Sequence, residues 1–385
     1  MEIRMNLRKF IVPEVVFGNG AFNMCGSYLR KLGCKRPLVV TDNGVRRAGW
    51  ADKISQILDE YHLEYAFFDD VSPNPRDYEV MNGAKVYQEF NADSLLSIGG
   101  GSAMDCAKGI GIVVTNGREI NDFAGVDLIL KPVPPMIFIP TTAGTSSDVS
   151  QFSIILDTVK RTKFAIISKS IIPDVSLIDP ITLTTVDKYL SACTGIDALV
   201  HAIEAFVSSA SSPMTDLNSL NAIELIYKNL QNSLNTPDNE YYRDQMMLAS
   251  FQAGMAFSNA SLGAVHATAH SLGGYLDLAH GECNALMLPE SIKINFDHSV
   301  ERYRRIAQIF GLDLKISGLS FKNQFIEKIK LFINESGIEF GLNKRGVKKS
   351  DVKALSERAY EDPCLATNPF YPSIRDIEVM YEEAL

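Results

Sequence analysis

Short apolar runs alternate with stretches of helical periodicity through the first half of this sequence, and that alternation limits the fold more than any other feature. Four runs are expected to form buried strands, at 37–41, 65–68, 94–98 and 136–139. Helical stretches at 50–61 and 78–90 lie between them. Strands that alternate with helices favour a parallel sheet covered by helices on both faces. The first half therefore predicts an α/β domain.

The second half has few β-branched runs and a different pattern. Helices are expected at 191–208, 214–234, 243–258 and 262–276, and near 300–310 and 321–336. A chain of 385 residues exceeds one ordinary core and allows two domains. We place the boundary near residue 185. This predicts an α/β domain over 1–185 and an all-α domain over 186–385.

A glycine-rich loop follows the third predicted strand, where residues 98–108 read IGGGSAMDCAK. Glycine lets the backbone approach a ligand closely, and the helix that follows presents the positive end of its dipole. A pyrophosphate is therefore expected at Gly100, Gly101 and Ser102. The alternative is an ordinary strand–helix turn, although three glycines exceed what such a turn needs. This is not the GxGxxG pattern, and Gly18-Asn19-Gly20 is interpreted as a turn.

Two further segments could contact a dinucleotide. Asp42 ends the first predicted strand, where an acidic residue binds ribose hydroxyls and repels a 2′-phosphate, which favours NAD over NADP. A turn or helix-capping role for Asp42 is equally consistent with the residue alone. The loop at 140–148, PTTAGTSSD, offers hydroxyls for ribose, nicotinamide or phosphate, although such clusters are usually plain loops.

Four of the six histidines fall close together, between residues 197 and 280. Asp197 and His201 are four residues apart in a predicted helix, so their side chains share one face. His266 and His270 repeat that spacing, and His280 is expected in a loop. Imidazole and carboxylate ligands suit Fe²⁺ or Zn²⁺. We therefore expect a metal site, with His270 nearby either as a proton carrier or as a residue that supports a ligand.

Two nearby carboxylates, Glu204 and Glu282, are alternative ligands. The helical phase places Glu204 on the His201 side, where it is expected to support a ligand rather than bind the ion. His62 and His298 are expected to be ordinary core or surface residues.

Charge and cysteine usage exclude several classes of protein. The net charge of −9, from 37 basic and 46 acidic residues, argues against a nucleic-acid partner. Six scattered cysteines without a CxxC pair favour a reduced, cytoplasmic protein. Residues 1–10 carry charges and no apolar core, so no signal peptide is expected. No run approaches the ~18 apolar residues of a membrane helix.

Four motifs together resemble the iron-containing, or group III, alcohol dehydrogenases. They are GGGSAMDCAK at 99–108, PTTAGTSSD at 140–148, TGIDALVHAIEAF at 194–206 and HATAHSLGGYLDLAHGECNALMLP at 266–289. The likeness runs from residue 17 to the end of the chain, and the last two motifs are highly specific together. The resemblance implies transfer of hydride between NAD and a small alcohol or aldehyde.

The same resemblance implies a Rossmann-like first domain, a helical metal-binding domain, a cleft between them, and dimers or larger homo-oligomers. It implies that Asp197, His201, His266 and His280 bind the metal, Fe²⁺ or alternatively Zn²⁺, with His270 in the active site. The cofactor residues implied are Asp42, Asn74, Gly99, Gly100, Gly101, Ser102, Thr141, Thr142, Thr145 and, close by, Lys163.

Three positions depart from the usual family pattern. Ser146 and Asp148 replace a glycine and a glutamate of the second loop, and Phe370 stands where arginine is usual. None of these changes removes a metal ligand. Phe370 is expected at the edge of the substrate pocket, where it would favour short uncharged alcohols over acids or phosphates.

Two other functions fit the same motifs. A lyase of the dehydroquinate synthase type uses a similar fold with NAD and a metal, but it needs several cationic side chains for a phosphorylated substrate, and the histidine motifs contain none. A dehydrogenase-like regulator of alcohol oxidation with little turnover is the main alternative, because a fold does not by itself determine function.

Overall fold

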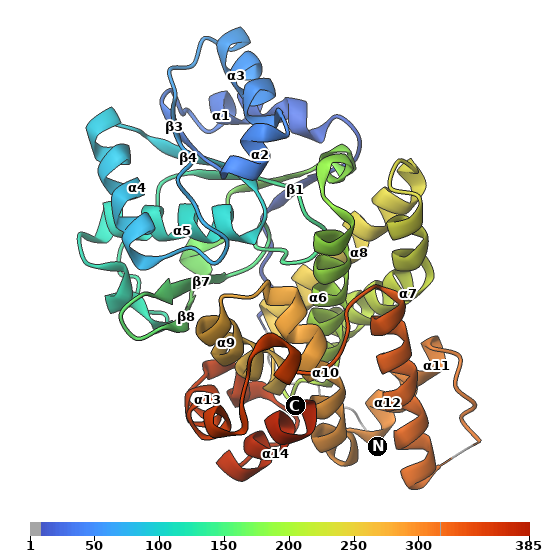
Figure 1. The fold of residues 1–385 in the computed structure, drawn as a ribbon. Coiled ribbons are helices and arrows are strands. Elements are labelled where there is room, and N and C mark those ends of the chain that lie inside the picture. Colours follow the sequence, from blue (N-terminus) through green and yellow to red (C-terminus); the bar gives the residue numbers. More distant parts are fainter. Residues whose placement is uncertain (1–8, 316) are drawn as a thin grey trace.

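The computed structural model describes residues 9–315 and 317–385 (Figure 1). The charged residues at positions 1–8, on which the expectation of no signal peptide partly rests, lie outside the described residues.

Six parallel strands form the main sheet, in the order β1-β9-β6-β4-β2-β3. The strands are β1 Glu14–Phe17, β2 Pro37–Val40, β3 Ala66–Phe68, β4 Ser94–Gly99, β6 Met136–Pro140 and β9 Val175–Ile178. All four predicted strands are present, and β1 and β9 were not predicted. The register pairs Gly99 with Pro140 at the ends of β4 and β6. The glycine loop and the PTTAGTSSD loop therefore leave the sheet side by side.

Helices cover both faces of this sheet, as the alternation predicts. The helices are α1 Cys25–Lys31, α2 Asn43–Arg47, α3 Trp50–Glu60, α4 Asp77–Phe90 and α5 Gly101–Asn116. Leu38 and Leu95 pack with Ile110 of α5 on one face. Val39, the neighbour of Leu38, points to the other face and packs with Ile54 of α3. Successive strand residues thus enter opposite layers.

A small second sheet was not expected from the sequence. It contains β5 Gly125–Val126, β7 Phe152–Asp157 and β8 Thr162–Ile167, in the order β5-β8-β7. The strands β7 and β8 form an antiparallel hairpin that pairs Phe152 with Ile167 and Asp157 with Thr162. This hairpin supplies one wall of the substrate cavity described below.

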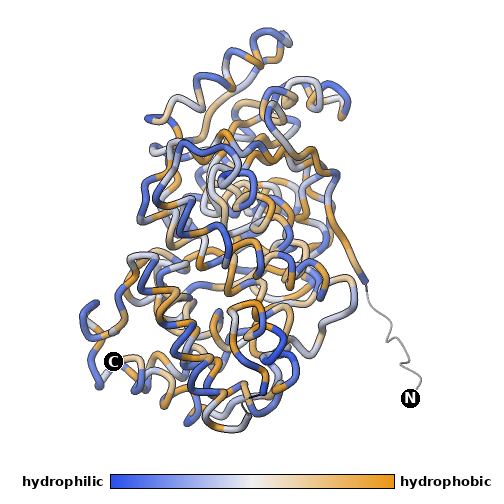
Figure 2. The backbone as a smooth tube through the Cα atoms, turned by 90° about the vertical axis from the view of Figure 1, so that its right-hand side faces the viewer, coloured by the Kyte–Doolittle hydropathy of each residue, from blue (hydrophilic) through white to orange (hydrophobic). Residues whose placement is uncertain are grey.

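No strand follows Ile178 in the part of the chain that the structure describes. The helices there are α6 Lys188–Val207, α7 Pro213–Asn235, α8 Glu240–Ala260, α9 Ala264–Leu276, α10 His280–Asn295, α11 Val300–Ile309, α12 Gly318–Glu335, α13 Val352–Tyr360 and α14 Ile374–Ala384. Along the outer helices hydrophobic and hydrophilic residues alternate, as helices with one buried face require (Figure 2). Helices α10, α13 and α14 were not among the predicted elements.

Helix α6 lies at the centre of the helical region (Figure 1). By length and composition it is the one described helix that could cross a membrane, but 89% of its apolar window is buried inside the protein. Such burial is typical of the core helix of a globular domain. The helix starts at the Asp187 N-cap, whose side chain accepts a hydrogen bond from Leu190 N. It carries Asp197 and His201 into the interior.

Candidate metal centre and cofactor cleft

Three helices bring the four predicted metal ligands together. Asp197 and His201 lie one turn apart on α6, His266 lies on α9, and His280 is the first residue of α10 rather than part of a loop. Asp197 Oδ1 is 3.9 Å from His201 Nε2, 4.0 Å from His266 Nε2 and 3.8 Å from His280 Nε2. Ligands bonded to one cation at ~2.0–2.2 Å have donor atoms roughly 3–4 Å apart. The cluster has the spacing of a metal centre.

Burial keeps two of these imidazoles neutral. It lowers the pKa of His266 well below the usual value, and the neighbouring His201 lowers it further. Burial likewise lowers the pKa of His280, with Lys163 the next largest cause. A neutral imidazole retains the nitrogen lone pair that a cation needs. The donor chemistry of the cluster therefore fits a divalent ion such as Fe²⁺ or Zn²⁺.

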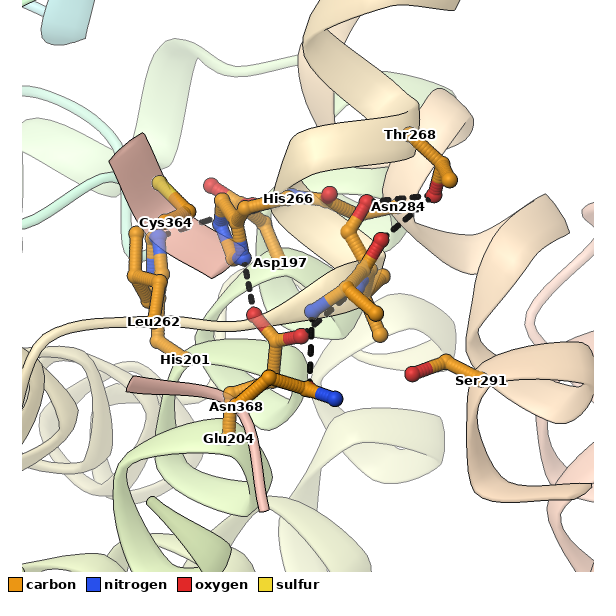
Figure 3. Close-up of polar contacts among 12 residues, drawn as sticks. Asp197, His201, Glu204, Leu262, His266, Thr268, Asn284, Ser291, Cys364 and Asn368 are labelled. Atoms are coloured by element: carbon orange, nitrogen blue, oxygen red, sulfur yellow. Dashed lines mark hydrogen bonds and ion pairs between the residues drawn. The ribbon is translucent and has the colours of Figure 1, made fainter. Parts of the chain in front are cut away.

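Glu204 orients the predicted ligand His266 through its Nδ1 atom, the ring nitrogen that does not face the other ligands. Its Oε2 accepts a hydrogen bond from His266 Nδ1 at 2.6 Å, and its Oε1 accepts one from Val265 N at 2.7 Å (Figure 3). Burial raises the pKa of Glu204 to about 7. A carboxylate at Nδ1 fixes the ring so that Nε2 faces the centre. The other candidate carboxylate, Glu282, instead pairs with Arg345 at 2.9 Å, so it is not available as a ligand.

His270 lies beside the centre and has its own partner. Its Nδ1 is 2.8 Å from Asp362 Oδ2, and its ring stacks against that of His280 with centroids 5.3 Å apart. Burial raises the pKa of Asp362, but the charge and hydrogen bond of His270 outweigh it and leave that pKa below its usual value. An ionised Asp362 holds the proton on Nδ1 and leaves Nε2 free. The sequence reasoning missed Asp362, although it lies in the family-like DPCLATNPF segment.

A cavity with a largely apolar surface opens beside the four histidines. Its apolar lining residues are Phe152, Ile154 and Leu156 of the β7 strand, Phe257 of α8, and Leu262. Phe257 also stacks on the ring of His201, with centroids 4.2 Å apart. Phe370 is not among the described lining residues; it stacks on His298 at 4.2 Å. The expectation that Phe370 shapes the pocket edge is therefore wrong.

A larger cleft runs from the sheet edge to the four predicted metal ligands. The predicted cofactor residues that line it are Asp42, Asn74, Gly100, Gly101, Ser102, Thr141, Thr142 and Thr145. Asp197 and His280 line its other end. A ligand lying in this cleft would thus extend from the glycine loop to the proposed metal ligands.

The glycine loop is shaped by backbone geometry and close packing. Gly99 has φ 159°, and Gly100 is the N-cap of α5. A Cβ on Gly101 would lie 2.8–2.9 Å from side-chain atoms of Thr145. Any larger residue would therefore displace the second loop. Gly100, Gly101 and Ser102, at the N-terminus of this 16-residue helix, line the cleft, a position that suits phosphate binding.

Asp42 has the helix-capping role considered for it, and its position leaves the ribose contact as a prediction. Its Oδ1 accepts hydrogen bonds from Gly44 N at 2.7 Å and Val45 N at 3.0 Å, so it caps α2. The same residue lines the cleft. One carboxylate oxygen can hold the helix while the other remains available to a ribose.

Comparison with known proteins places this geometry in a family. The model described as "Iron-containing alcohol dehydrogenase" matches residues 13–180, and "Fe-containing alcohol dehydrogenase family, C-terminal" matches 191–385. The chain belongs to the iron-containing alcohol dehydrogenases. The NAD-dependent methanol dehydrogenase of Bacillus methanolicus is 36% identical over 98% of this chain and 99% of its own.

Other relatives agree. The 1,3-propanediol dehydrogenase of Klebsiella pneumoniae is 37% identical over 97% of this chain and 98% of its own. A crystal structure of 1,3-propanediol oxidoreductase superposes with a TM-score of 0.94 at 37% identity, covering 99% of this chain and 100% of that one. This chain is accordingly an NAD- and metal-dependent alcohol dehydrogenase that interconverts alcohols and aldehydes. The comparisons do not favour the regulatory alternative.

Asn74 and Lys163 lie where the larger cleft meets the cavity beside the histidines. Lys163 Nζ donates to Asn74 Oδ1 at 2.7 Å, and Asn74 Nδ2 donates to Asp277 Oδ1 at 2.8 Å. Burial lowers the pKa of Lys163. Asn74 lines both the cleft and the cavity, whereas Lys163 lines only the cavity. Lys163 therefore lies beyond the cleft, on the substrate side.

Two charged residues of α5, the half-buried Asp105 and the buried Lys108, were not singled out from the sequence. Asp105 accepts hydrogen bonds from Ser147 Oγ at 2.5 Å and Ile154 N at 3.1 Å. Lys108 Nζ donates to Ser150 O at 2.8 Å and Phe152 O at 2.7 Å. Their signal was present in the GGGSAMDCAK motif. They tie the second loop and the β7 strand to the helix that follows the glycines.

The unusual residues of the second loop are accommodated locally. Ser146 has φ 51°, in the region that glycine enters without strain, and its Oγ donates to Ser250 O at 2.7 Å. Asp148 accepts a hydrogen bond from Ser176 Oγ at 2.7 Å. Both side chains are satisfied away from the four ligands.

Proposed function

We propose that this dehydrogenase acts on small, uncharged primary alcohols and their aldehydes, with NAD as cofactor. The observation that carries the proposal is the apolar cavity directly beside the four-ligand cluster. Most of its exposed wall area is apolar, although Asp105 and several hydroxyl groups also line it. Lys163, its one described cationic lining residue apart from the histidines, already binds Asn74. Relatives named for methanol and 1,3-propanediol support a short substrate.

Asp197, His201, His266 and His280 are the proposed ligands of Fe²⁺, with Zn²⁺ as the alternative. The facing positions of their donor atoms and the neutral state of His266 and His280 support this assignment. A divalent ion held there supplies Lewis acidity, which favours loss of the proton from an alcohol oxygen. Glu204 holds His266 in the orientation that binding needs.

The cofactor would bind along the larger cleft. The proposed contacts are Asp42 with ribose hydroxyls, Gly99, Gly100, Gly101 and Ser102 with the pyrophosphate, and Asn74, Thr141, Thr142 and Thr145 with the remainder, with Lys163 beyond them. An acidic residue at Asp42 would repel a 2′-phosphate and so favours NAD over NADP. The N-terminus of α5 adds a favourable dipole for the pyrophosphate.

In alcohol oxidation, NAD⁺ held in the cleft would supply the acceptor for the hydride of the carbinol carbon, and the hydroxyl proton would pass to solvent. His270 lines the cavity and would accept this proton at Nε2, because Asp362 occupies its Nδ1. The apolar residues Phe257 and Leu262 exclude water from the reacting carbon. In the reverse direction the same groups return the proton to the aldehyde oxygen.

We also assign the cofactor half to residues 1–185 and the metal half to residues 186–385. The last strand before this boundary ends at Ile178, and α6 begins at Lys188. A cytoplasmic homodimer or larger homo-oligomer without a nucleic-acid or membrane partner fits the acidic net charge and the six free cysteines.

The test is NADH formation by metal-free protein reloaded with Fe²⁺ or Zn²⁺, with ethanol, 1-propanol, butanol and 1,2- and 1,3-diols as substrates. We expect turnover that depends on the metal and is faster with short uncharged alcohols than with hydroxy acids. No turnover with any alcohol or aldehyde and either metal would support the regulatory alternative instead.

A further inference from the structure

Asn284 lies on α10, one turn after His280, inside the proposed metal centre (Figure 3). Its Nδ2 is 2.6 Å from Asp197 Oδ1, 3.1 Å from His266 Nε2 and 3.3 Å from His280 Nε2. The residue is fully buried, and its Oδ1 has no hydrogen-bond partner among the described residues. No motif analysis of the sequence pointed to it.

The three atoms that surround Nδ2 are three of the four proposed ligand atoms. An amide nitrogen carries two hydrogens and no lone pair that could accept or coordinate. Its contacts with His266 and His280 are therefore possible only while the single Nε2 lone pair of each ring is not committed to an ion, whereas Asp197 Oδ1 has a further lone pair that can accept a hydrogen bond in either state. The carbonyl oxygen of the same amide is a suitable ligand or close neighbour of a divalent cation, whereas the N–H₂ group is repelled by it.

We propose that Asn284 holds the ligand set together in the metal-free protein and turns its amide when the ion binds, so that Oδ1 faces the ion. This inference rests on the proposed ligand set. The turn removes the positive end of the amide from the cation and gives the buried, unpartnered Oδ1 an electrostatic partner. Asn284 is thus a positioning residue with a different role in each state of the centre.

Two variants separate the donor from the acceptor. Asn284→Asp keeps the shape but loses the donor, so it places a second carboxylate against Asp197 and destabilises the metal-free protein. With the ion bound, that carboxylate adds a negative oxygen. We expect a lower Tm without metal, a larger rise in Tm on loading, and a Kd for Zn²⁺ at least ~10-fold lower than that of the wild type.

Asn284→Leu has a similar volume but neither donor nor acceptor. We expect Zn²⁺ to bind at least ~10-fold more weakly, as measured by competition with a chromogenic chelator. We also expect the visible spectrum of the Co²⁺-loaded protein to change. The matched control is Asn295→Asp, on the same helix. Asn295 is also buried, but it bonds to Asn368 and Ser291. The Asn295→Asp substitution should lower Tm equally with and without metal, and it should leave the Kd for Zn²⁺ and the Co²⁺ spectrum unchanged.

Wild-type Kd and Co²⁺ spectrum in both Asn284 variants would overturn the inference, and Asn284→Asp keeps the test available if Asn284→Leu does not fold. His266→Ala separates this failure from that of the ligand set. If His266→Ala loses the ion while the Asn284 variants behave as wild type, only the role of Asn284 is wrong. If His266→Ala binds Zn²⁺ with wild-type affinity, the ligand set itself is wrong.

Discussion

The glycine loop after β4 and the histidine cluster of α6, α9 and α10 open into the same cleft, but they are built from different groups. The loop offers backbone N–H groups and needs the absence of side chains at Gly99–Gly101. The cluster offers side-chain lone pairs and needs each ring held at a set angle by a partner such as Glu204. The first site is therefore sensitive to added atoms and the second to removed ones.

The sharpest test of this difference is His266→Ala. Loss of one of four ligands should abolish metal binding and NADH formation, by more than the ~10–100-fold that loss of a supporting partner costs. The cleft should remain intact, because the glycine loop does not depend on His266. Metal analysis and NADH fluorescence titration measure the two sites separately. Loss of NADH affinity along with the metal would mean that the two sites are not independent.

Asp362→Asn tests the histidine cluster without removing a proposed metal ligand. The amide can donate to His270 Nδ1 and so favour the wrong tautomer, with the proton on Nε2. We expect kcat to fall by about 10–100-fold, the cost of losing a supporting partner and less than the ~10²–10⁴-fold of an acid–base group itself, while KM for NAD and metal content stay unchanged. Steady-state kinetics and metal analysis decide this, and an unchanged kcat would remove His270 from the proton path.

Gly101→Ala tests the glycine loop. The added Cβ would lie within 2.9 Å of Thr145, so the second loop must shift away from the cleft. We expect KM for NAD to rise about 10-fold, equivalent to about 1.4 kcal/mol, with no change in metal content. NAD titration at saturating alcohol measures it. A normal KM would show that the cofactor does not lie on Gly101.

Lys108→Met examines the buried cation that ties α5 to the second loop. Burial lowers the pKa of Lys108 to about 8, from an ordinary value of 10.5. The unfolded chain therefore binds more protons than the folded one between these values, and Lys108 makes stability rise with pH across that window. Urea unfolding should give a free energy of unfolding that rises more between pH 8 and pH 10 in the wild type than in Lys108→Met. Parallel pH dependence in the two proteins would contradict it.

Phe370→Arg should have the smallest effect. The residue stacks on His298 and does not line the substrate cavity. We expect kcat and KM for short alcohols to stay within about 2-fold of the wild type, as for substitutions away from special contacts. Kinetics with ethanol, butanol and a hydroxy acid check this. A gain of activity on the acid would restore the role that the sequence suggested for this position.

Much of the fold and of the site was predictable because the relevant signals are local. Apolar runs predicted β2, β3, β4 and β6, and the spacing of Asp197 with His201 placed two proposed ligands on one helix face. The short strands β1 and β9 were missed, and so was the β7–β8 hairpin, whose exposed residues Lys160 and Arg161 interrupt its apolar pattern. Those strands form because the rest of the sheet and α5 offer them a partner.

The sequence by itself determined which groups were available: three consecutive glycines before a helix, a carboxylate and an imidazole four residues apart, and an acidic net charge. These properties depend on composition and on the period of a helix. Only the tertiary structure decided that Glu204 supports His266, that Glu282 pairs with Arg345, that Asp362 contacts His270, and that Asn284 contacts the ligand cluster. Those partners are 62 to 92 residues apart, so only the packing of helices and loops brings them within hydrogen-bonding distance.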